Sequence, residues 1–138
     1  MTLIEDILSC TDHRPYQLPF GKWRYYQEWN NVLFLHWKIS FDLLRSCVPP
    51  ELNLDTFDRE VYVSLVAFTM EKIRKHNLPA FKYVSNFEEI NLRTYVNNHS
   101  RRGVYFLSIE AGNRLSTFIA RALSGLPYEK ASIFRSET

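Results

Sequence analysis

Apolar and polar residues alternate along several segments of the chain, and this period of two predicts β-strands. Residues 61–72 form the longest such segment, and both of its faces are largely apolar, so we expect this strand to be covered on both sides. Residues 87–97 and 103–110 also alternate, with a hairpin turn expected between them at 97–102. Residues 22–39 are rich in aromatic and branched side chains around Asn30 and Asn31, which predicts two strands joined by a turn or a bulge.

Helical periodicity is confined to three stretches. A short helix on the outside of the domain is expected near residues 3–8, and a brief one after Ser40 that ends at Pro49 and Pro50. The clearest helix starts at Asn113, carries apolar residues at helical spacing and ends at Gly125. Asp58-Arg59 is expected to form a turn, and residues 75–86 a loop. Together these elements predict an α+β fold, mostly β, with a curled antiparallel sheet and helices packed outside it.

The strand at residues 87–97 carries the main candidate chemistry. Its alternation places Glu89, Asn91, Arg93 and Tyr95 on one face of the sheet. On an open sheet this face would meet water, whereas in a curled barrel it would line a cavity and hold a small polar ligand. Glu89 and Arg93 lie roughly 13 Å apart along the strand, so we expect them to bracket a ligand and not to pair with each other.

Length and charge limit the alternatives. The 138 residues fit a single domain, 1–138, with residues 1–12 as an N-terminal extension. A formal charge of +2 is far from the basic excess of dedicated nucleic-acid-binding proteins, so no nucleic-acid partner is expected. The aromatic content of 15% calls for a large core, a lined cavity or an interface.

The N-terminus and the ligand-forming residues point to no special compartment or cofactor. Residues 1–10 have no basic start and contain two acidic residues, so they do not resemble a signal peptide. No apolar run reaches the roughly 20 residues that span a bilayer, and we expect a cytoplasmic protein without membrane contact. Cys10 and Cys47 lack the spacing of a zinc or redox pair, and the four histidines are widely spread, so no metal or other cofactor is expected.

Several segments, in their order along the chain, resemble the bacterial YqjF-like family of unknown function, which is grouped with the acetoacetate decarboxylase-like barrels. The resemblance runs from about His13 to Ala131. The matching segments are His13-Arg14-Pro15, Trp29 to Trp37, Val48 to Asp58, Glu89 to Val96, Gly103 to Ser108, Ala120-Arg121 and Gly125-Leu126-Pro127-Tyr128.

The resemblance has consequences for catalysis. Acetoacetate decarboxylases carry a lysine pair after a similar turn. One lysine forms a Schiff base, and the other lowers the pKa of the first. Here Tyr128 and Glu129 occupy the two lysine positions and Lys130 comes one place late. Decarboxylation through a Schiff base is therefore not expected, and whether the chain is an enzyme stays open.

The resemblance also suggests binding residues. Glu89 corresponds to a glutamate that lines the cavity of the decarboxylases, which favours the cavity-lining alternative for its face of the strand. Arg121 matches an arginine before the turn and is either a ligand contact or an ion-pair partner, and Tyr128 joins the candidates. Because Arg93 and Tyr95 both donate hydrogen bonds to oxygen, the expected ligand is a small organic acid or a carbonyl compound.

The extent of the chain leaves a second hypothesis open. Family members continue past the Gly-Leu-Pro-Tyr turn, whereas residues 132–138 carry no family motif, so the sequence suggests a partial barrel that lacks the C-terminal part. Such a barrel would expose a sheet edge and apolar surface. The alternative function is therefore a non-catalytic remnant or a self-association module that forms a homo-oligomer through this edge.

Overall fold

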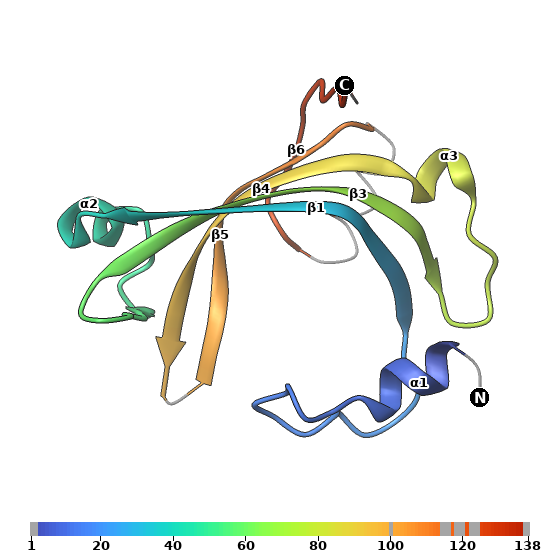
Figure 1. Ribbon diagram of the computed structural model, residues 1–138, viewed down its shortest axis with the longest axis horizontal. Helices are drawn as coiled ribbons and strands as arrows, with labels where there is room; N and C mark the ends of the chain where they lie inside the picture. Colours follow the sequence, from blue (N-terminus) through green and yellow to red (C-terminus); the bar gives the residue numbers. More distant parts are fainter. Residues whose placement is uncertain (1–2, 100, 114–116, 118–120, 122–124, 137–138) are drawn as a thin grey trace.

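A curved sheet of long strands dominates the computed structural model, which describes residues 3–99, 101–113, 117, 121 and 125–136. Figure 1 shows the arched sheet, with β1 bending toward α1 at its N-terminal end and α2 following at the other. In chain order the elements are α1 (Leu3–Ser9), β1 (Tyr25–Ile39), α2 (Phe41–Ser46), β2 (Asn53–Leu54), β3 (Val61–Lys75), α3 (Lys82–Ser85), β4 (Phe87–Asn98), β5 (Arg101–Ala111) and β6 (Tyr128–Lys130).

The strands pair in the order β1-β3-β4-β5-β6, and β2 pairs with the end of β4. Every pairing is antiparallel except that of β5 with β6, which is parallel. Within the described residues β1 and β6 do not pair with each other, so the sheet is not closed into a barrel. The predicted α+β, mostly β fold with a curled sheet is confirmed, while the parallel pairing of β6 was not predicted.

β1 is one strand with a bulge, and not two strands. Its register against β3 shifts between Asn30 and Leu33, and Asn31 has a φ of 51°. Asparagine tolerates this left-handed conformation better than branched residues, and an extra residue there bends the strand without ending it. Of the two predicted ways to join the aromatic segments, the bulge is therefore the one observed.

β3 lies at the centre of the core and is covered on both faces, as predicted. Val66, Phe68 and Met70 pack with Phe87 and Ala111 on one face. On the other face, Val61 and Val63 pack with Leu44 of α2. The packing partners from neighbouring strands explain why alternate residues on both sides of this strand are apolar.

Two tight turns reverse the chain, one between β2 and β3 and one between β4 and β5. Asp58 and Arg59 have φ values of 51° and 66°, and Phe57 and Glu60 exchange both backbone hydrogen bonds around them at 2.9 Å. This is the predicted turn, with positive φ at both central residues as two-residue hairpin loops require. The second hairpin brings Asn98 opposite Arg101, which confirms the predicted β4–β5 turn.

The helices agree with the sequence in part. α1 buries no residue, as expected for a helix on the outside, and α2 begins after Ser40. The four-residue α3 lies in the segment predicted to be a loop. Most of the predicted helix 113–125, including its apolar face, lies outside the described residues. Gly125 has a φ of 69°, the conformation expected of a glycine that ends a helix.

Candidate functional site

The face of β4 that carries the predicted polar residues is buried where it crosses the middle of the sheet. Glu89 is only 3% exposed and Asn91 only 1%. Both residues lie opposite apolar side chains of β3, Glu89 next to Phe68 and Asn91 next to Val66. The water-facing alternative for this face is therefore wrong for these two residues.

Glu89 lies at one end of this buried row and holds an unusual carboxyl group. The Asn91 amide donates a hydrogen bond to Oε1 at 3.4 Å, and the Tyr128 hydroxyl donates one to Oε2 at 3.3 Å. Burial raises the pKa of the Glu89 carboxyl from 4.5 to about 7, and the two hydrogen bonds only partly oppose this shift. Burial also raises the pKa of Tyr128, so this phenol remains a hydrogen-bond donor at neutral pH.

Asn91 and Arg93 each present a buried polar atom without a partner among the described residues. These atoms are Oδ1 of Asn91, an acceptor, and Nε of Arg93, a donor. The Arg93 guanidinium lies over the Phe34 ring at 4.7 Å from its centroid and forms no ion pair with Glu89 or another described acid. Buried polar groups are nearly always hydrogen-bonded, so the two atoms mark a place where a polar ligand or water can bind.

A second set of hydrogen bonds continues the row beyond Arg93. The Ser64 hydroxyl, which is fully buried, is hydrogen-bonded to the Tyr95 hydroxyl at 2.9 Å and to Nδ1 of His36 at 2.7 Å. The His36 ring stacks on Phe34, the same ring that carries Arg93. This chain of groups connects β4 to the exposed side chain of His36 on β1.

Sheet register explains why residues distant in sequence meet here. Ser64 pairs with Arg93 across β3 and β4, and with His36 across β3 and β1. Tyr128 pairs with Ile109, which is opposite Asn91. Directly paired residues point to the same face of a sheet, so three strands and β6 contribute side chains to one row.

Five of the six predicted binding residues lie along this row, namely Glu89, Asn91, Arg93, Tyr95 and Tyr128. The sixth, Arg121, has an exposed side chain and takes part in none of the hydrogen bonds described for this row. Glu129 and Lys130 are also exposed on β6. Alternation puts Glu129 on the opposite face from Tyr128, and Lys130 is the last residue of this three-residue strand.

His36 and Ser64 were not predicted as site residues. Their partners are 28 and 31 residues away along the chain, so only the strand register brings them together. One signal was present in the sequence: Ser64 interrupts an otherwise apolar face of its strand, with Val66 and Phe68 following on that face. A single hydroxyl in such a position needs a buried partner.

Metal binding has no support in the part of the chain that the structure describes, where no three His, Cys, Asp or Glu side chains gather in a suitable group. Across the same residues, every helix is too short or too polar to cross a bilayer.

Two solved structures share the arrangement of this sheet. An acetoacetate decarboxylase-like enzyme from Sphingomonas wittichii RW1 superposes with a TM-score of 0.59 at 17% sequence identity, over 78% of this chain and 41% of its own. The enduracididine biosynthesis enzyme MppR, complexed with pyruvate, gives a TM-score of 0.55 at 11% identity, over 85% of this chain and 44% of its own. The fold is thus of the acetoacetate decarboxylase-like class.

Sequence comparison identifies the family within that class. Residues 26–138 match DUF2071, a family of uncharacterized conserved proteins, and the chain belongs to this family. Over 111 residues it is 40% identical to the uncharacterized protein YqjF of Bacillus subtilis, which covers 80% of this chain. The resemblance to YqjF-like proteins is therefore confirmed. The chain spans 46% of the length of that relative, and less than half of each structural neighbour.

Proposed function

We propose that this domain binds a small organic acid or carbonyl compound along the row formed by Glu89, Asn91, Arg93, Tyr95 and Tyr128. The observation that carries the proposal is the pair of unpartnered buried atoms, Oδ1 of Asn91 and Nε of Arg93, on one face of β4. The two residues are separated by one position, so their Cα atoms lie roughly 7 Å apart. A ligand of a few heavy atoms spans that distance.

The chemistry of the row matches such a ligand at both ends. The Arg93 guanidinium is held by its contact with Phe34 and can donate charge-assisted hydrogen bonds to a carboxylate. Asn91 Oδ1 accepts a hydrogen bond, which suits a hydroxyl or a protonated acid. Glu89, with a pKa of about 7, can donate or accept a proton at neutral pH.

Covalent catalysis through a lysine is not part of the proposal. Tyr128 contacts Glu89 and has no amine, and Glu129 is exposed. Lys130 follows on the same strand but is exposed, without the burial that activates a Schiff-base lysine. We therefore expect neither imine formation nor decarboxylation by that route.

The test is calorimetric titration of the protein with pyruvate and, in parallel, with lactate, which adds a hydroxyl donor opposite Asn91. We expect both to bind, and Arg93→Ala to weaken both by at least about tenfold, the cost of one charge-assisted hydrogen bond. Arg101→Ala provides the matched control, because Arg101 is exposed at the β4–β5 hairpin.

Asn91→Leu tests the contact at Asn91 separately from the contact at Arg93. It should weaken lactate binding more than pyruvate binding, because only lactate brings a hydroxyl donor to the amide oxygen. Equal affinity of the Arg93→Ala variant and the unaltered protein would remove Arg93 from the site. Absence of binding by all small carboxylates and ketones would reject the proposed function.

A second candidate function rests on β1. This 15-residue strand pairs only with β3, so its outer edge is free within the described residues. Leu33, Leu35 and Trp37 are 41–50% exposed along it. Natural sheets protect such edges with charges, prolines or bulges. The bulge of β1 lies between Asn30 and Leu33, and the stretch beyond it, from Phe34 to Trp37, contains no proline or fully charged side chain. We propose that a second copy of the chain pairs with this edge.

Light scattering after size-exclusion chromatography tests the pairing. We expect a dimer whose dissociation is promoted by the double change Leu35→Lys and Trp37→Lys, whereas Leu78→Lys, at an exposed apolar residue outside the strands, leaves it intact. A monomer at every concentration would reject self-association through β1.

A further inference from the structure

A second cluster of side chains lies at the other end of the long strands. It surrounds a depression of about 370 Å³ lined by Lys22, Trp23, Arg24, Tyr25, Lys75 and His76. Tyr25 pairs with Lys75 at the start of β1 and the end of β3. Lys75 follows Phe68, the partner of Glu89, by seven residues on β3, so this depression lies roughly 23 Å along the strand from Glu89.

Aromatic rings fix the geometry of the depression. The Trp23 ring meets the His76 ring edge-on, with centroids 4.3 Å apart and an interplanar angle of 89°. The Arg74 guanidinium lies over two rings, 4.6 Å from the centroid of Tyr26 and 5.7 Å from that of Trp23. Arg74 is not itself part of the lining, but its contact with Trp23 helps to hold that ring at the edge of the depression.

Positive charge in this cluster is not neutralised locally. No described acidic side chain forms an ion pair with Lys22, Arg24, Arg74 or Lys75. The backbone N–H of His76 donates to the carbonyl of Arg24 at 2.8 Å, which ties the two sides of the depression together. His76 also has a buried Nδ1 atom without a partner among the described residues. The charge favours a negatively charged ligand, and the ring nitrogen leaves one hydrogen-bonding position without a partner beside it.

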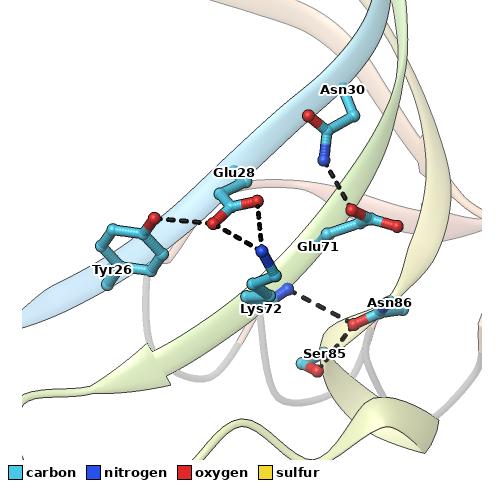
Figure 2. A network of polar contacts seen from close by, with 7 residues as sticks. All are labelled: Tyr26, Glu28, Asn30, Glu71, Lys72, Ser85 and Asn86. Atoms are coloured by element: carbon cyan, nitrogen blue, oxygen red, sulfur yellow. Dashed lines mark hydrogen bonds and ion pairs between the residues drawn. The ribbon is translucent and has the colours of Figure 1, made fainter. Parts of the chain in front are cut away.

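Nearby carboxylates are occupied by other groups, as Figure 2 shows. Glu28 accepts hydrogen bonds from the Tyr26 hydroxyl at 2.6 Å and from Lys72 Nζ at 3.0 Å. These bonds lower the pKa of Glu28, so it is charged and is matched by Lys72. Glu71 accepts a hydrogen bond from the Asn30 amide at 2.6 Å. Neither carboxylate forms an ion pair with Lys22, Arg24 or Lys75, so these cations remain available for an external anion.

We propose that this depression binds a small aromatic phosphate of the nucleotide type. Lys22, Arg24 and Lys75, which line the depression, would contact the phosphate, and the flat ring would pack against the exposed Tyr25 and the half-buried Trp23. The volume of about 370 Å³ falls within the range of pockets that hold single small molecules and is too small for a folded partner. The site is separate from the row on β4 and does not depend on the function proposed there.

Titration with adenosine 5′-monophosphate, phenyl phosphate and inorganic phosphate, followed by calorimetry, tests the proposal. We expect the two aromatic phosphates to bind more tightly than inorganic phosphate. Arg24→Gln should weaken them at least tenfold, because Arg24 lines the depression. Trp23→Leu should remove the advantage of the aromatic probes over phosphate.

Lys82→Glu is the matched control, since Lys82 is exposed on α3 and outside the depression. Lys75→Glu gives a second variant in case Trp23→Leu fails to fold, and it should weaken all three probes. Weakening by Lys82→Glu as strong as that by Lys75→Glu would show non-specific attraction and overturn the proposal. The absence of binding by all three probes would overturn it too. Tighter binding of a single-stranded oligonucleotide through the same residues would also overturn it and would assign the site to nucleic acid.

Discussion

Two strands of this sheet depart from the usual rule that apolar side chains are buried and polar ones exposed. In β4, the polar side chains of Glu89 and Asn91 are 3% and 1% exposed, whereas in β1 the apolar side chains of Leu33 and Trp37 are 50% and 48% exposed. β4 has neighbours on both sides, but β1 pairs only with β3. Position in the sheet, and not side-chain type, therefore determines which of these residues meet water. Each exception to the usual polarity coincides with a proposed function, which is ligand binding at β4 and self-association at β1.

The largest effect should come from opening the buried centre. Phe68 is 1% exposed and stacks on Trp29 with ring centroids 4.2 Å apart. Phe68→Ala should lower the free energy of unfolding by about 3–5 kcal/mol through lost burial and a cavity. Leu33→Ala on β1 should cost less than about 1 kcal/mol. Urea unfolding followed by tryptophan fluorescence measures both, and equal losses would erase the contrast between the two strands.

Glu89 should make the stability of the protein depend on pH. Its pKa is 4.5 when unfolded and about 7 when folded, so between these values the folded state binds more protons and stability falls as pH rises. The loss reaches about 3 kcal/mol above pH 7 and is absent below pH 4.5. Glu89→Gln should remove this dependence and be the more stable protein at pH 8. Unfolding curves at pH 4, 6 and 8 provide the measurement, and parallel pH profiles of the two proteins would contradict the burial of a titrating carboxyl.

A smaller effect is expected at the other end of the row. Ser64→Ala removes the partner of both Tyr95 and His36 and should cost about 1–2 kcal/mol. Ser46→Ala is the control, because its hydroxyl bonds only an exposed backbone carbonyl and a neighbouring thiol on α2. Thermal unfolding compares the two, and a Ser64→Ala variant as stable as the control would show that the three-residue chain contributes no stability.

The smallest effect should come from a polar contact at the surface. Arg102 approaches Asp55 at 3.6 Å, but its side chain is 76% exposed. Arg102→Ala should therefore change the free energy of unfolding by less than about 0.5 kcal/mol. Urea denaturation at low and high salt checks this value, and a loss as large as that of Ser64→Ala would mean that burial does not separate the two kinds of contact.

The sequence predicted the row on β4 because period two assigns residues to faces. It could not tell whether the face of Glu89 and Asn91 meets water, since that depends on which strands lie beside β4 and what packs on them. Pairing across β3 joins Ser64 to His36 and Tyr95, and no local pattern reports that register. Short elements were the other limit: α3 has only four residues and no side-chain cap. In contrast, the turn at Asp58 and Arg59 was predicted because two adjacent polar residues between strands carry a local signal.

The most direct test is the ¹³C chemical shift of the Glu89 carboxyl carbon, followed from pH 4 to pH 9 with and without saturating pyruvate. We expect a midpoint near pH 7 in the free protein and a clear displacement of that midpoint when pyruvate occupies the adjacent atoms of Asn91 and Arg93. A midpoint near 4.5 that pyruvate leaves unchanged would contradict both the burial of this carboxyl and its place in a binding site.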